Sequence, residues 1–289
     1  MHTPQTGENR TAIPGLTLYQ RSTPTPCNPV KYEPSLSVFV QGKKRVILGG
    51  TAYLCDGSKF LLTSVDVPVV SQTVAASEAE PLLSLLLRLD MQVVRELLIQ
   101  EEFPTPEIAF RGPGIAVGET TVGLLSACSR LVDLLDEPEE TSFFSKLIQR
   151  EIMYRLLRGP QGESLRAIAT AGDQSQRTAK AIAWLRANYA KPFRIEELAE
   201  VTRMSVSTLH HQFRALTELS PLQYQKHLRL HAARQLMLMD GLDAASAAFE
   251  VGYESTSQFN REYSRLFGQP PMRDVKALRD SHESVTGAT

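Results

Sequence analysis

Between Ile195 and Pro271 the chain repeats one local pattern at a constant offset of fifty residues. Three positions correspond between the copies: Ser205 with Ser255, Leu209 with Phe259, and Phe213 with Tyr263. In each copy an alanine-containing segment, Leu198-Ala199 or Ala247-Ala248, precedes a short turn, and a serine suited to a helix N-cap follows it. This spacing is typical of a helix-turn-helix, so the repeat predicts two tandem units that bind two major grooves of DNA.

An uninterrupted helical pattern from Leu222 to Met239 joins the two copies and ends at Asp240-Gly241. A helix of about 18 residues spans about 27 Å, because each residue adds about 1.5 Å. The two units are therefore expected to lie about one turn of DNA apart.

Charge is distributed unevenly along the 289 residues, although the net charge is only −1. Residues 175–289 carry 15 Lys/Arg against 12 Asp/Glu, whereas residues 1–174 carry 16 against 20. The C-terminal part thus has the sign that contact with phosphates requires. The length and a hydrophobic content of 42% suit two domains of ordinary size.

The three cysteines, Cys27, Cys55 and Cys128, indicate neither a disulfide framework nor a zinc site. The apolar run Leu82–Leu89 is too short to span a bilayer, and no segment has the pattern of a signal peptide. We therefore expect a soluble cytoplasmic protein without a membrane partner.

The sequence predicts strands in the N-terminal half. We expect residues 1–12 to be loose and Ile13–Pro34 to be extended and irregular. After Pro34, short apolar segments separated by Gly and Asp turns predict a small sandwich or barrel, with Leu36, Val38 and Val40 alternating against Ser37, Phe39 and Gln41. The predicted strands that follow are Val46–Leu48, Thr51–Cys55, Phe60–Ser64, Val67–Thr73 and Leu82–Leu89.

Helices are predicted after these strands. Asp90 is placed to cap a helix over Met91–Gln100, and Glu102–Gly118 is predicted as loop. Helical spacing then predicts a hairpin over 124–135 and 143–157, suited to packing on the barrel or on a second subunit. The further predictions are a helical turn over Leu165–Thr170, a linker over 172–176 and a helix over Thr178–Tyr189.

The segment AFEVGYESTSQFNREY at residues 248–263, with Phe267-Gly268 and Pro270-Pro271, resembles the signature of AraC-type transcription regulators. The resemblance covers about residues 177–279. YEPSL at 32–36, QGKKR at 41–45 and RLLRGP at 155–160 resemble the N-terminal domain of one AraC-type subfamily. The resemblance implies an α+β chain: a cupin-like β-barrel with helices over 1–170 for effector sensing or dimerisation, a linker over 171–176, a tandem helix-turn-helix domain over 177–280, and a tail over 281–289.

Positions matched to the family assign the residues that face bases. They are Ser207, His210 and His211 in the first unit and Thr256, Ser257, Gln258, Asn260 and Arg261 in the second. Arg261 suits guanine, and Gln258 or Asn260 suits adenine. Paired histidines depart from the long or basic side chain common in the family, which makes pH-dependent affinity conceivable. Arg194 and Arg203 are candidate phosphate contacts; for every position the alternative is an ordinary solvated helix face.

Aromatic, apolar and thiol side chains are the candidates for an effector site in the barrel: Phe39, Tyr53, Leu62, Cys27 and Cys55. The same residue types also fill barrel cores, and buried thiols without function are common. We predict no metal and no cofactor, because no histidine occurs between His2 and His210, and the pair His227 and His231 has no evident third ligand.

The sequence thus predicts a sequence-specific regulator that binds double-stranded DNA as a homodimer, responds to a small-molecule effector or a redox or electrophile signal, and has RNA polymerase as a possible partner. We do not expect an enzyme, since neither a Gly-x-Ser-x-Gly elbow nor a phosphate-binding loop occurs. Two alternatives stay open, a cupin-type enzyme with an accessory helical domain and an interaction adaptor that does not bind DNA.

Overall fold

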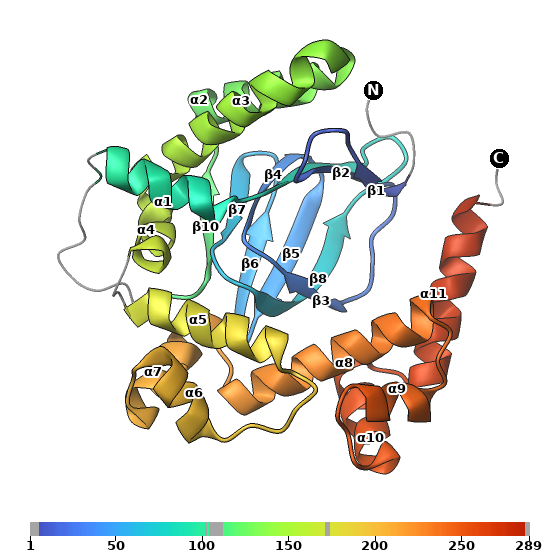
Figure 1. The fold of residues 1–289 in the computed structure, drawn as a ribbon. Helices are drawn as coiled ribbons and strands as arrows, with labels where there is room; N and C mark the ends of the chain where they lie inside the picture. Colours follow the sequence, from blue (N-terminus) through green and yellow to red (C-terminus); the bar gives the residue numbers. More distant parts are fainter. Residues whose placement is uncertain (1–5, 102, 104–111, 171–173, 287–289) are drawn as a thin grey trace.

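A computed structural model describes residues 6–101, 103, 112–170 and 174–286. Two antiparallel sheets form the N-terminal half, and helices form the C-terminal half (Figure 1), which confirms the predicted α+β class. The six-stranded sheet has the order β1 (Gly7–Arg10), β2 (Leu16–Arg21), β9 (Leu82–Arg88), β4 (Ser35–Gln41), β7 (Lys59–Thr63), β10 (Ile115–Glu119). The four-stranded sheet has the order β3 (Asn28–Tyr32), β8 (Val67–Ala75), β5 (Lys43–Leu48), β6 (Thr51–Cys55).

The two faces of the six-stranded sheet bury different cores, because side chains alternate along a strand. On β7, Leu62 belongs to a core shared with the helices of the N-terminal half, whereas Leu61 belongs to a second core. That second core takes residues from both sheets, including Phe39, Val46 and Val69. The sheets therefore face each other across the second core, and the helices cover the outer face of the larger one.

Strands begin earlier than the sequence predicts. The expectation of a loose segment is wrong for β1, residues 1–5 lie outside the described residues, and Ile13–Pro34 is extended but holds the regular strands β2 and β3. Leu16 and Leu18 are buried and pair through β2 with the leucine-rich β9. Pro29 lies in β3, which is the edge strand of its sheet and so tolerates a residue without an N–H group. The proline and threonine content of this segment concealed short strands that tertiary pairing stabilises.

The predicted alternation along β4 is confirmed from Leu36 to Phe39, but both faces of the strand are buried. Leu36 and Val38 belong to the core under the helices, and Phe39 belongs to the core between the sheets. The pairing of β4 with β9 shifts register between Phe39 and Gln41, so Val40 lies at a bulge. Val40 is 63% exposed and does not extend the buried face of Leu36 and Val38.

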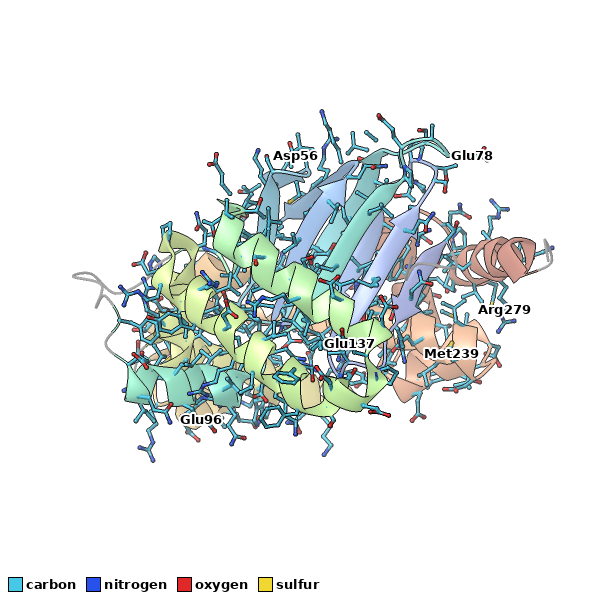
Figure 2. The ribbon with its side chains drawn as sticks, turned by 90° about the horizontal axis from the view of Figure 1, so that it is seen from above. Asp56, Glu78, Glu96, Glu137, Met239 and Arg279 are labelled. Carbon is cyan, nitrogen blue, oxygen red and sulfur yellow. The ribbon has the colours of Figure 1, made fainter. Side chains whose placement is uncertain are left out.

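Helices of the N-terminal half follow the predicted order. They are α1 (Met91–Gln100), α2 (Val122–Asp133), α3 (Pro138–Arg158) and α4 (Glu163–Ala169). Asp90 caps α1 as predicted, accepting a hydrogen bond from the Gln92 amide at 2.8 Å. Figure 2 shows the hairpin of α2 and α3 lying across the strands, with Glu137 near its turn. The predicted loop over 102–118 is wrong at its end, where β10 forms; residues 102 and 104–111 lie outside the described residues.

Seven helices follow in the described part of the C-terminal half: α5 (Gln174–Ala187), α6 (Ile195–Thr202), α7 (Val206–Thr217), α8 (Pro221–Met239), α9 (Ala244–Glu250), α10 (Thr256–Phe267) and α11 (Pro271–Thr286). Helix α5 begins inside the predicted linker, whose residues 171–173 lie outside the described residues, and α11 extends into the predicted tail. The first helix-turn-helix packs on the sheets, because Leu209, Phe213 and Tyr224 join the core between them.

Candidate nucleic-acid interface

Each copy of the repeat folds into two helices joined by a tight turn, α6 with α7 and α9 with α10. The predicted serine caps are present. The Ser205 hydroxyl accepts a hydrogen bond from the Thr208 amide at 3.1 Å, and the Ser255 hydroxyl accepts one from the Gln258 amide at 3.3 Å. These caps satisfy amides that the first helical turn leaves without partners, so α7 and α10 begin at equivalent positions.

The inner faces of α7 and α10 hold each unit together. Leu209, Phe213, Phe259 and Tyr263 are all 0% exposed, which confirms that they are core residues. Phe213 packs edge-on against Tyr224 of α8, with ring centroids 5.4 Å apart. The outer faces are thereby left for contacts with another molecule.

The turn differs between the units. Gly252 adopts a left-handed φ of +88°, as predicted, and a Cβ there would overlap the Ala190 carbonyl oxygen. In the first unit Arg203 takes the left-handed position with φ of 54°, and its carbonyl oxygen accepts a hydrogen bond from Arg177 at 3.2 Å. Of these two turns, only the turn of the second unit lies so close to another backbone segment that a side chain does not fit.

The predicted base-facing residues lie on the outer faces of α7 and α10. In the first unit Ser207, His210 and His211 are exposed. In the second unit Ser257, Gln258, Asn260 and Arg261 are exposed, whereas Thr256 is half-buried. Spacings of three and four residues place Ser207, His210 and His211 on one face of α7. On α10 the same spacings place Ser257 with Asn260 and Arg261, and Gln258 with Arg261, whereas Gln258 and Asn260 lie on different sides of Arg261. The structure therefore brings both predicted sets together as polar surfaces beginning at a helix N-terminus, the end that helix-turn-helix proteins direct toward base edges.

One long helix connects the two units that carry these surfaces. Helix α8 has 19 residues and connects the end of the first unit to the start of the second. Figure 1 shows both units on the side of the sheets away from the α2–α3 hairpin, with α8 running between them. At about 1.5 Å per residue α8 is about 28 Å long, close to the length of one DNA turn.

The pattern did not single out Glu262, a half-buried residue on α10. Its carboxylate accepts hydrogen bonds from Lys226 at 2.7 Å, Tyr253 at 2.8 Å and Gln258 at 3.2 Å. Burial pushes the pKa of this carboxyl upward, but these donors outweigh burial and lower it below its ordinary value. Glu262 therefore stays charged and ties α8, the turn and a base-facing residue together. In the sequence, only the position of Glu262 four residues after Gln258 indicated that these two side chains meet.

Arg229 and Arg234 serve the fold of the second unit. Arg229 donates to the carbonyl oxygens of Tyr189 at 2.7 Å and Gly252 at 2.8 Å. Arg234 forms a two-pronged ion pair with Asp274 at 2.8 and 2.9 Å, and both side chains are nearly buried. These two cations are thus occupied within the protein.

The candidate phosphate contacts are accessible. The Arg194 side chain is 79% exposed and lies 3.7 Å from Glu196, a solvated pair that holds it weakly. Arg203 is exposed at the end of α6. Both residues flank the first unit, as a phosphate contact requires.

The proposed effector residues do not form one site. Phe39 and Tyr53 contact the core between the sheets, whereas Leu62 lies on the opposite face, under the helices. Cys27 is exposed and Cys55 is buried. Burial raises the pKa of the Cys55 thiol to about 11, so it is a poor candidate for a reactive sensor.

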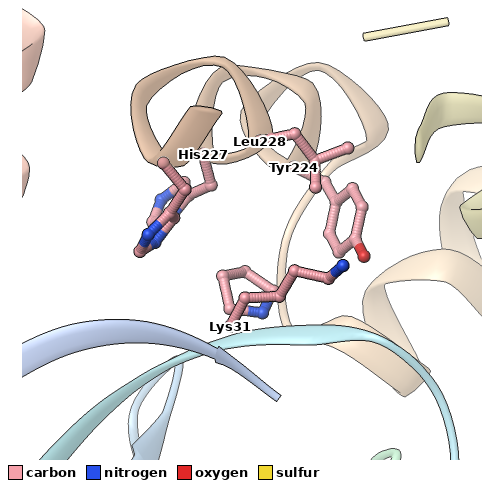
Figure 3. A pocket seen from close by; sticks show the side chains of 6 residues that line it. Lys31, Tyr224, His227 and Leu228 are labelled. Carbon is pink, nitrogen blue, oxygen red and sulfur yellow. The ribbon is translucent and has the colours of Figure 1, made fainter. Parts of the chain in front are cut away.

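A small pocket lies between the sheets and α8, lined by Lys31, Pro68, Tyr224, His227, Leu228 and His231 (Figure 3). Burial is the main cause that lowers the pKa of His231, to about 3, and the ring packs edge-on against Phe267 with centroids 5.3 Å apart. His231 therefore has a packing role, and His227 lines the pocket. Within the described residues no group of three or more His, Cys, Asp or Glu side chains is arranged to hold a metal ion.

Family comparisons agree with this architecture. The model of the AraC-type transcriptional regulator N-terminus matches residues 12–164, and a helix-turn-helix domain model matches residues 198–277. Among relatives, the HTH-type transcriptional activator RhaS of Escherichia fergusonii is 29% identical over 160 residues, which cover 54% of this chain and 56% of RhaS. RhaS of Salmonella schwarzengrund is 29% identical over 159 residues, 55% and 56% of the two chains. The chain thus spans about half the length of these relatives.

Solved structures of ToxT from Vibrio cholerae strain SCE256 share the fold. An apo ToxT variant has a TM-score of 0.61 at 12% identity, covering 92% of this chain and 98% of ToxT. Wild-type ToxT with bound unsaturated fatty acid has a TM-score of 0.60 at 11% identity, covering 90% and 94%. Across the described residues no helix has the length and apolarity needed to cross a membrane. The family model of the AraC-type N-terminus matches more than half of this chain, so the chain belongs to the family of AraC-type transcriptional regulators.

Proposed function

We propose that this chain is a sequence-specific DNA-binding transcription regulator, acting in the cytoplasm on promoter DNA, that reads two successive major grooves. The observation that carries the proposal is the pair of exposed polar faces on α7 and α10, each capped by a serine and connected by one 19-residue helix. Arg261 then grips a guanine edge, and Gln258 or Asn260 pairs with adenine. In the first unit Ser207, His210 and His211 contact the neighbouring groove.

Arg261→Ala tests the base-reading role. With a duplex selected by the wild-type chain, this change should weaken binding by about 1–3 kcal/mol and relax the preference at one base pair, because a bidentate contact to guanine is lost. Arg95→Ala, an exposed arginine on α1, provides a matched control that should leave affinity unchanged. Equal affinity of Arg261→Ala and wild type for the selected duplex would contradict the proposal.

The N-terminal half controls the first unit through direct contacts. The carboxylate of Glu218, at the end of α7, accepts two hydrogen bonds from the turn between β5 and β6. The donors are the Gly50 amide at 3.1 Å and the Thr51 hydroxyl at 3.3 Å. The Gly114 amide donates to the Leu216 carbonyl oxygen at 2.8 Å. A ligand or covalent change that alters the sheets thereby alters how α7 is presented to DNA.

A second group of contacts fixes α5 and α8 to the sheets. Asp66 is 7% exposed, and its carboxylate pairs with Arg186 at 2.6 Å and Lys31 at 3.3 Å. Its carbonyl oxygen accepts a hydrogen bond from the Tyr224 hydroxyl at 2.8 Å. The signal that reaches these contacts is proposed to be a small-molecule effector or a redox or electrophile signal, with Cys27 as the exposed thiol.

The exposed side of the α2–α3 hairpin supports a homodimer. Its apolar side chains are solvent-exposed to 40% or more: Val122, Leu125, Phe143, Phe144 and Leu147. A patch of this kind on a soluble chain marks an interface, and α2 and α3 lie far from the reading helices (Figure 1), so two copies joined there can both bind DNA.

Sedimentation equilibrium of Phe143→Ser tests this interface. The dissociation constant of the dimer should be about tenfold higher for the variant than for the wild-type chain. Ile99→Ser, at an 85% exposed position on α1, is the matched control and should sediment as wild type. A monomeric wild type, or a Phe143→Ser dimer of unchanged affinity, would contradict the homodimer. RNA polymerase is the proposed partner of the DNA-bound form.

A further inference from the structure

Gln258 occupies the first turn of α10, and its side chain does not make the contact that this position favours. A Gln at the third helical position commonly folds back to accept a hydrogen bond from the N-cap amide, completing a capping box. Gln223 does so at the start of α8, accepting from the Ser220 amide at 3.0 Å. Gln258 instead extends along α10 and donates to Glu262 at 3.2 Å.

The charge of Glu262 fixes which end of the Gln258 amide faces it. An ionised carboxylate only accepts hydrogen bonds, so the Gln258 nitrogen must point toward Glu262 and the oxygen away from it. Lys226 and Tyr253 hold the carboxylate in place by donating to its two oxygens at 2.7 and 2.8 Å. The amide therefore presents an acceptor oxygen and one remaining N–H group toward the exposed face of α10.

That pattern matches one base edge. In the major groove, adenine offers a donor at N6 beside an acceptor at N7, whereas guanine offers two acceptors. An outward acceptor with an adjacent N–H is complementary to adenine, and the outward oxygen would oppose the O6 of guanine. We infer that Glu262 is a specificity-determining positioning residue, which orients Gln258 to select adenine at one base pair; the inference rests on the DNA-reading function proposed above.

Glu262→Gln tests the inference with little change in shape. A glutamine at this position can donate as well as accept, so it lets the Gln258 amide turn over and present two N–H donors, which suit guanine. We expect the full chain carrying Glu262→Gln to lose about tenfold of its preference for adenine over guanine at one base pair. Gln258→Ala should lose the preference at that same base pair.

One matched control separates specificity from the change of charge. Glu250→Gln makes the same change of charge at an exposed position on α9 and should retain the adenine preference. The readout is relative affinity for four duplexes that differ at one base pair of the site selected by the wild type.

The outcomes distinguish the two proposals. If the wild-type chain selects no duplex from a random pool, the DNA-reading function fails and this inference falls with it. If the wild type selects a site but Glu262→Gln keeps the full adenine preference, or Gln258→Ala changes no base pair, the assignment of Glu262 is overturned while the DNA-reading function stands.

Discussion

Removing the Glu218 carboxylate should loosen the first helix-turn-helix from the sheets. In Glu218→Ala two hydrogen bonds are lost, one from the Gly50 amide and one from the Thr51 hydroxyl. Both donors lie at the surface, where water replaces part of the lost energy, so we expect a cost of about 1–2 kcal/mol for the pair. This corresponds to a shift of about 5- to 30-fold in the equilibrium between the docked and released unit.

Amide hydrogen exchange measures this equilibrium at two places. The Gly50 amide loses the Glu218 carboxylate as its hydrogen-bond acceptor in Glu218→Ala, so it should exchange faster in any case. The Gly114 amide is the informative reporter, because it donates to Leu216 and does not touch Glu218. If the unit docks as one body, exchange at Gly114 should also accelerate by about 5- to 30-fold.

Glu200→Ala, at an exposed position on α6, is the matched control and should leave exchange at Gly114 unchanged. Accelerated exchange at Gly50 with an unchanged Gly114 amide would refute the reasoning, since it would mean that Glu218 does not hold the docked unit.

Three further predictions concern the turn, the thiols and the charged network. Gly252→Ala should lower the free energy of unfolding by about 2 kcal/mol or more in denaturant titration, because φ is +88° and the new Cβ overlaps the Ala190 carbonyl oxygen; an unchanged midpoint would contradict this. Iodoacetamide at pH 8 should label Cys27 alone in the native protein, since Cys55 and Cys128 are buried and burial raises their pKa values to about 11 and 12; mass spectrometry showing a second adduct before unfolding would count against it. The pKa of Glu262 is lower in the folded state than in the unfolded state, where it is near 4.5. Its stabilising contribution should therefore be complete above the unfolded pKa and be lost as pH falls through the folded pKa. The difference in unfolding free energy between wild type and Glu262→Gln should shrink below about pH 4, and a difference that grows there would contradict this sign.

The sequence predicted the tandem units well because their signals are local. A serine cap, a glycine in a tight turn and apolar residues four apart act within one helix or its neighbour, and Ser255, Gly252 and Phe259 all take the predicted roles. The predicted base-facing sides of α7 and α10 are exposed, because the apolar residues four apart turn the opposite side of each helix into the core. The contact of these sides with bases stays a prediction.

The sequence-based predictions are wrong or incomplete where pairing with distant parts of the chain decides the local structure. β2 forms because Leu16 and Leu18 pair with a leucine-rich strand about seventy residues later, a partner that no local pattern of Ile13–Pro34 reveals. Val40 lies at a bulge in the pairing of β4 with β9 and is exposed, although alternation places it on the same face as the buried Leu36 and Val38. Likewise, the contact of Glu218 with Gly50 joins residues far apart in the chain and could not be read from spacing.

Footprinting on the duplex selected by the wild-type chain tests the central claim most directly. Because one 19-residue helix joins the two reading units, hydroxyl-radical cleavage should show two protected segments on one face of the DNA, about 10 base pairs apart. Arg261→Ala should weaken the protection of one segment more than the other. A single protected segment, or two segments on opposite faces of the duplex, would contradict the account.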